Sequence, residues 1–181
     1  LSLLQNGEID LLTAIAFSKE RTEKYDFNKE TVFPNWGQVY TSNGIKVDSI
    51  TELAGRTVAG LDKDIYFKSL KELTEKAGLE VTYKGVDEYD QVFQLLEQQE
   101  AEAGILPRLY GDLNEKKFRV NKTTIIVRLS ELRFAAKKSV NQELLATIDT
   151  HLHKLKQDNN SLYFQSVSRW LGQQDETVDI D

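Results

Sequence analysis

The residues best suited to chemistry in this sequence are one arginine and two aromatic side chains. The guanidinium of Arg21 offers a rigid fork of N–H donors that matches the two oxygens of a carboxylate, although the residues alone favour a surface ion pair with Glu20 or Glu23. Trp36 and Tyr40 follow a turn, where an aromatic face can stack on a ligand or a cation, or can pack between structural elements. These residue types predict recognition of a small molecule.

A fourth candidate precedes a predicted helix. The turn Leu61–Asp64 (LDKD) ends where free backbone N–H groups at the start of a helix could hold an anion. Asp62 and Asp64 can instead cap that helix themselves, and we favour this interpretation for the turn.

Other kinds of chemistry find little support. The chain has no cysteine, no nucleophile-elbow motif and no glycine-rich phosphate loop. His151 and His153 are two positions apart on a predicted helix, so they point to different sides and cannot chelate one ion. We expect no enzymatic activity, no metal and no cofactor.

The composition describes a folded protein of modest acidity. The 181 residues include 40% hydrophobic and 29% charged side chains, with a formal net charge of −6, which fits one large or two small domains. Without a dense Lys/Arg run, nucleic acid is not an expected partner. No stretch approaches the roughly 20 apolar residues that span a bilayer. The chain opens at Leu1 and contains no methionine, which indicates an excerpt of a longer protein.

Helix and strand signals alternate through the middle of the chain. An apolar run ends at Phe17, and a second extended stretch covers residues 32–41. A short helix with a capping box formed by Ser49 and Glu52 is predicted at 49–54. Strands and helices are then predicted in turn at 56–61, 64–77, 79–84, 88–98 and 101–106. This β-α-β-α-β succession predicts a parallel sheet with helices on both faces.

The C-terminal third has a different pattern. A short helix at 108–114 is followed by two extended runs, 118–123 and 125–136. Two amphipathic helices are predicted at 141–156 and 161–171 from their apolar spacing.

Four stretches, in this order, resemble motifs of one family. Asn6–Leu12 (NGEIDLL) resembles the strand start with Gly-Glu/Lys-Ile/Val-Asp. Ser18–Arg21 (SKER) with Tyr25–Asn28 (YDFN) resembles T-x-E-R followed by x-D-F-S. Ile50–Ala59 (ITELAGRTVA) resembles I-x-D-L-x-G-K-x-V-A, and Glu102–Gly104 stands where the family has Asp-Ala. The chain thus resembles the bilobed type II periplasmic solute-binding proteins, in particular the variety that serves as sensor modules of membrane signalling receptors.

This resemblance implies an α/β fold of two lobes with mostly parallel sheets flanked by helices. It places the first part of lobe 1 at 1–45, lobe 2 at 46–127, and the return crossing with the last helices of lobe 1 at 128–181. It also implies that lobe 1 lacks its first strands, which predicts an open sheet edge. Two crossings between lobes allow hinge closure over a ligand.

The resemblance also suggests a ligand site. The family uses the arginine at the position of Arg21 for the α-carboxylate of its ligand, and Ala16 and Phe17 lie just before it. Ala16 stands where the family tends to have a hydroxyl residue, and Pro107 falls near its acidic residue for the ligand ammonium. The predicted ligand-binding set is Ala16, Phe17, Arg21, Trp36, Tyr40, Asp64 and Pro107. The departures at Ala16 and Pro107 argue against an ordinary α-amino acid.

The function implied is extracytoplasmic binding of a small polar solute, amino-acid-like or a small carboxylate. Hinge closure would then signal to receptor domains of the same polypeptide, such as a histidine kinase or a cyclic-dinucleotide enzyme. The alternative is the free binding subunit of an ABC importer, with its permease as partner, and an enzyme of the same fold is a third reading. The expected location is the periplasm, tethered to the inner membrane, and a dimer is a further expectation.

Overall fold

The computed structural model describes residues 1–171, with the side chain of Leu171 excepted. The chain forms two compact units. Unit 1 comprises Leu1–Phe33 and the chain from Glu131 onward, and unit 2 is the single stretch Pro34–Ser130. The sequence predicts that lobe 2 covers residues 46–127, and unit 2 of the structure covers residues 34–130. Unit 2 begins earlier because Val39 and Val47 belong to its hydrophobic core.

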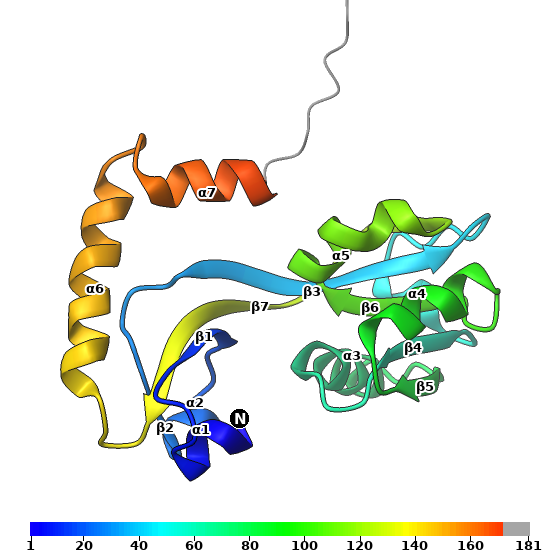
Figure 1. Cartoon of the computed structure of the whole chain (residues 1–181). Coiled ribbons are helices and arrows are strands. Elements are labelled where there is room, and N and C mark those ends of the chain that lie inside the picture. Colours follow the sequence, from blue (N-terminus) through cyan, green and yellow to red (C-terminus); the bar gives the residue numbers. More distant parts are fainter. Residues whose placement is uncertain (172–181) are drawn as a thin grey trace, which may run out of the picture. The chain divides into compact units, whose positions relative to one another are not determined.

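The secondary structure follows the predicted order closely (Figure 1). The elements are α1 (Ser2–Asn6), β1 (Leu12–Ala16), α2 (Lys19–Thr22), β2 (Tyr25–Phe27), β3 (Phe33–Ser42), the 3-10 helix η1 (Ile50–Leu53), β4 (Thr57–Leu61), α3 (Ile65–Lys76), β5 (Thr82–Val86), α4 (Tyr89–Glu97), β6 (Ala103–Pro107), α5 (Arg108–Asn114), the 3-10 helix η2 (Glu115–Lys117), β7 (Val120–Lys137), α6 (Gln142–Gln157) and α7 (Leu162–Leu171).

Two local predictions are wrong. The capping box at Ser49 does not form, because its hydroxyl bonds the Glu52 carboxylate at 3.0 Å and no backbone N–H, and the segment is a single 3-10 turn. The two extended runs after α5 form one continuous strand, β7, since Thr123 and Thr124 between them are β-branched and favour extended backbone.

The sheet of unit 2 is only partly parallel. Strand β4 pairs in parallel with β5 and β6, and β3 runs antiparallel to β6. The parallel pairing predicted for the three strands of the β-α-β-α-β succession is confirmed, and β3 adds an antiparallel strand beside them. Parallel pairs arise where a helix carries the chain back, as α3 and α4 do, whereas β3 precedes these crossovers.

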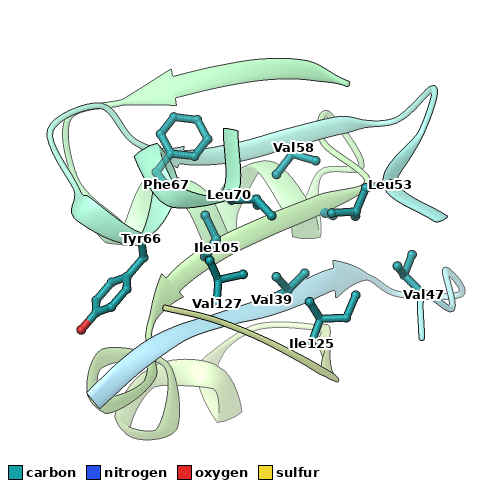
Figure 2. Close-up of a cluster of buried hydrophobic side chains, with 11 residues drawn as sticks. Val39, Val47, Leu53, Val58, Tyr66, Phe67, Leu70, Ile105, Ile125 and Val127 are labelled. Carbon is teal, nitrogen blue, oxygen red and sulfur yellow. The ribbon is translucent and has the colours of Figure 1, made fainter. Parts of the chain in front are cut away.

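Helices cover both faces of this sheet, as predicted. The consecutive β4 residues Val58 and Ala59 point to opposite faces. Val58 packs in a cluster with Phe67 and Leu70 of α3, and Ala59 packs in another with Phe93 of α4. Figure 2 shows the first cluster. Each fully buried Val, Leu, Ile or Phe side chain contributes about 1.5–3 kcal/mol of hydrophobic stabilisation.

Unit 1 has a smaller core. Strands β1 and β2 both pair antiparallel with the C-terminal part of β7. Leu4, Tyr25 and Ala135 form its cluster of buried residues. Helix α1 ends at Asn6 and is capped by Gly7, whose φ of 78° is the left-handed conformation that favours glycine.

One carboxylate of helix α6 makes several hydrogen bonds to residues 28–30, within unit 1. Asp149 accepts hydrogen bonds from the backbone N–H groups of Lys29 and Glu30, both at 2.8 Å, and from the Asn28 amide at 2.9 Å. Burial on its own raises the pKa of Asp149, but these hydrogen bonds outweigh it and hold the pKa below the ordinary value for an aspartate. The carboxylate is therefore charged, and stabilising, at neutral pH.

In the part of the chain that the structure describes, no helix combines the length and the apolar character needed to cross a membrane.

Candidate ligand-binding site

The local fold of unit 1 holds Arg21 in a defined position. Strand β1 ends at Ala16, and the hydroxyl of Ser18 then caps the short helix α2 by accepting a hydrogen bond from the N–H of Arg21 at 3.3 Å. The side chain folds back so that its Nη1 donates to the carbonyl of Ala16 at 2.6 Å. Ala16 thus takes part through its backbone, which explains why this position needs no hydroxyl to orient the arginine.

The guanidinium of Arg21 makes no ion pair with any carboxylate among residues 1–171, and neither Glu20 nor Glu23 pairs with it. Its side chain is half-buried. A guanidinium fixed by one bond to a carbonyl keeps other N–H donors for a planar anion. This geometry suits the capture of a carboxylate.

Phe17 lies beside this arginine in the sequence but is engaged in packing. Its ring meets Phe27 edge to face, with the centroids 5.2 Å apart, and the Arg133 guanidinium lies 4.4 Å from the ring centroid. The backbone strand before it carries a β-bulge at Ala14, whose φ is 53°. The bulge sets the direction in which the chain leaves β1 toward α2.

In unit 2, three predicted residues share one edge of the sheet. The parallel strands β4 and β6 end at Leu61 and Pro107, so Asp64 and Pro107 lie at the carboxyl ends of neighbouring strands. Gly37 of the antiparallel β3 pairs with Pro107, which brings Trp36 to the same edge. Ligands of open α/β sheets bind at the carboxyl ends of the strands.

Asp64 shows the capping arrangement that the sequence favours. One carboxylate oxygen accepts from the N–H of Tyr66 at 2.6 Å, and the other accepts the hydroxyl of Tyr89 at 2.5 Å. Burial raises the pKa of Tyr89, and this bond to a carboxylate raises it further, so the phenol is neutral and donates. The first N–H groups of α3 are therefore taken by the protein itself.

Trp36 is half-buried and carries a cation on its face. The guanidinium carbon of Arg108 lies 4.4 Å from the Trp36 ring centroid, and Arg108 Nε donates to Asp112 at 3.1 Å. One face of the indole is thus covered by Arg108. The charge beside Pro107 is positive, whereas the family resemblance predicts an acidic residue here.

Tyr40 takes the packing role that the sequence left open. Its side chain is fully buried, it meets Phe93 edge to face at 5.1 Å, and it lies within the second cluster of unit 2. Successive side chains of strand β3 point to alternate faces of the sheet from Trp36 onward, and Tyr40 pairs with Gly104 well inside the sheet. Its ring has no face open to a ligand.

The sequence analysis did not find Tyr89 and Arg108. Tyr89 lies among the apolar residues of its helix, and nothing in the neighbouring sequence indicates that its hydroxyl contacts Asp64. Arg108 follows Pro107 directly, so the charge beside the proline was visible, but its stacking on Trp36 depends on the pairing of β3 with β6.

Two residues of the Tyr25–Asn28 motif make structural contacts. Asp26 pairs with Lys138 at 2.9 Å and accepts the Ser139 N–H at 2.8 Å, and Asn28 accepts the Phe134 N–H at 2.8 Å.

His153 contacts Glu30 at 3.0 Å and lies at the surface. Among residues 1–171, no cluster of three potential metal ligands occurs.

Comparison with known proteins places the fold. No protein-family model matches the sequence, and no curated protein sequence matches it. Solved structures do match over nearly the whole chain. The probable amino-acid ABC transporter extracellular-binding protein of Bacillus subtilis matches with a TM-score of 0.81 and 22% identity, over 95% of this chain and 75% of that one.

Two further solved structures resemble the chain over a similar extent. An ancestral arginine-binding protein bound to arginine matches with a TM-score of 0.76 and 23% identity, over 94% of this chain and 75% of its own. The GluR0 ligand-binding core of Nostoc punctiforme, in complex with L-glutamate, matches with a TM-score of 0.73 and 21% identity, over 94% of this chain and 77% of that one. The chain therefore has the α/β fold of the two-lobed type II periplasmic binding proteins.

Proposed function

We propose that the protein binds a small polar solute that carries a carboxylate, either amino-acid-like or a simple organic acid. The observation that carries this proposal is the state of Arg21. Its side chain is half-buried, oriented by the Ala16 carbonyl, and not paired with a carboxylate among the residues the structure describes. A guanidinium that is oriented by a carbonyl and keeps paired N–H donors matches the two oxygens of a carboxylate, so the arrangement favours such a ligand.

The matched structures support the class of ligand. The B. subtilis protein is named for amino-acid transport, and the other two hold arginine and L-glutamate. Each of these ligands carries an α-carboxylate. Arg108, which pairs with Asp112, stands beside Pro107 where the resemblance predicts an acidic residue, so Pro107 itself offers no carboxylate to a ligand ammonium.

We further propose that the protein acts outside the cytoplasmic membrane, as a sensor module of a tethered receptor. A free binding subunit of an ABC importer is the second candidate, and the description of the B. subtilis protein as an extracellular-binding protein of a transporter favours it. The full gene separates the two. A membrane span followed by a kinase or cyclase domain supports the sensor, and a lipoprotein signal with no further domain supports the importer.

A thermal-shift screen tests the binding proposal. Amino acids, mono- and dicarboxylates and polyamines would be added to the protein, to Arg21→Ala and to the matched control Arg119→Ala, which removes an exposed arginine of unit 2. We expect a carboxylate to raise the melting temperature of the parent and of the control, because ligand binds the folded state, and not of Arg21→Ala. An equal rise in all three would refute the role of Arg21.

A further inference from the structure

Helix α3 makes polar contacts with both segments that connect unit 2 to unit 1. The chain enters unit 2 at Pro34 and leaves it after Ser130. The hydroxyl of Tyr66 lies 2.5 Å from Ser130 Oγ, and Ser130 Oγ donates to the carbonyl of Asn35 at 3.2 Å. One side chain of α3 thus reaches the outgoing segment directly and the incoming segment through a single hydroxyl.

The direction of these hydrogen bonds follows from the donors present. A serine hydroxyl has one proton, and Ser130 donates it in the hydrogen bond to the Asn35 carbonyl. The bond between the two hydroxyls must then be donated by Tyr66. Burial raises the pKa of Tyr66, which keeps the phenol protonated and able to donate at any physiological pH.

The surroundings leave this tyrosine little freedom. Its side chain is 3% exposed, and a Cβ at Gly37 would lie 2.7 Å from the Tyr66 Cβ, so β3 packs directly on the root of the ring. Figure 2 shows the ring leaving the hydrophobic cluster with its hydroxyl directed away from the other labelled side chains. Asn35, the incoming partner, is also buried, and its side chain accepts the N–H of Leu109 at 3.4 Å.

A second contact from α3 reaches the outgoing segment. Arg128 Nη1 donates to the hydroxyl of Ser69 at 3.1 Å. The backbone of Arg128 has a φ of 50°, in the left-handed region that a residue with a side chain seldom adopts. A residue in this region costs conformational energy, and its side chain is bonded to α3.

We infer that Tyr66 is a positioning residue that locks the two connecting segments of unit 2 to each other and to the start of α3. The same residue donates its backbone N–H to Asp64, at the sheet edge where the predicted ligand residues of unit 2 lie. Tyr66 therefore contacts that edge through its backbone N–H and the connectors through its side-chain hydroxyl. The inference rests on the proposed function only for this consequence, because the lock itself exists without ligand.

Hydrogen exchange without ligand tests the lock. Tyr66→Phe removes only the hydroxyl, and we expect amides of residues 35–37 and 128–130 to exchange about tenfold faster, as the loss of a buried hydrogen bond predicts. Tyr83→Phe is the matched control, since its hydroxyl bonds Thr74 near the other end of α3. Ser130→Ala should reproduce the effect, and the double variant should add little to it.

A distance measurement between the units separates positioning from mere stability. The chain contains no cysteine, so spin labels at Gln94→Cys in α4 and Lys154→Cys in α6, both exposed, are unique. We expect Tyr66→Phe to broaden the distance distribution and Tyr83→Phe to leave it unchanged. Equal distributions in both variants, or connector exchange no faster than in the control, would overturn the inference while leaving the solute-binding proposal standing.

Discussion

At the scale of single residues, the structure separates side chains that are engaged by the fold from one whose guanidinium pairs with no carboxylate among the described residues. Tyr40, Asp26 and Asn28 are engaged by the protein itself. Arg21 is oriented by a backbone carbonyl and keeps donors for another acceptor. The residue types alone could not distinguish these cases, because an arginine beside two glutamates reads equally well as an ion pair.

Asp64 permits a direct test of its capping role. Asp64→Ala should lower the free energy of unfolding by about 1–2 kcal/mol, since it removes an N-cap and leaves the Tyr89 hydroxyl without its acceptor. Urea unfolding measures this change. Asp62→Ala, at the exposed position two residues earlier, is the control and should cost less than about 0.5 kcal/mol. Equal effects of the two variants would contradict the assignment.

Gly111 provides a test of the packing around Tyr40. A Cβ at this position would lie 2.2 Å from the Tyr40 hydroxyl oxygen, so Gly111→Ala should destabilise the protein by about 1–3 kcal/mol despite the better helix propensity of alanine. Adding Tyr40→Phe should recover part of that loss, because the clashing oxygen is removed. Thermal unfolding of the single and double variants checks the prediction, and a neutral Gly111→Ala would show that the ring has room to move.

At the scale of elements, periodicity located the helices and strands well, and pairing was harder to foresee. The apolar spacing in α3 and α4 identifies two helices with one buried face each, and both cover the sheet as expected. The antiparallel course of β3 depends on which strand it meets, which local signals do not carry. The stacking of Arg108 on Trp36 follows from that pairing and could not be predicted either.

The contact of helix α6 through Asp149 has a definite pH dependence. The pKa of Asp149 is held below its unfolded value, so its stabilisation is complete above about pH 5 and is lost as the pH falls through the folded pKa. Asp149→Asn should cost about 1–2 kcal/mol at pH 7 and progressively less below about pH 4. Urea unfolding at both pH values measures it, with Glu143→Gln on the exposed side of α6 as control. A cost that stays constant with pH would contradict the account.

At the scale of the whole molecule, the two units differ in how much core they possess. Unit 2 buries two clusters on the two faces of its sheet, whereas the cluster of unit 1 has three buried members among the described residues. Native-state hydrogen exchange should therefore show slower amides in β4 and β6 than in β1 and β2. Equal protection in the two units would mean that they unfold together.

The central claim is that a carboxylate ligand binds through Arg21, and calorimetric titration tests it most directly. The best carboxylate from the thermal-shift screen would be titrated into the parent protein, Arg21→Lys and Arg119→Ala. We predict that Arg21→Lys weakens binding about 10- to 100-fold, because lysine cannot form the paired N–H bonds of a guanidinium, and that Arg119→Ala binds as the parent does. Unchanged affinity in Arg21→Lys and in Arg21→Ala would contradict the claim.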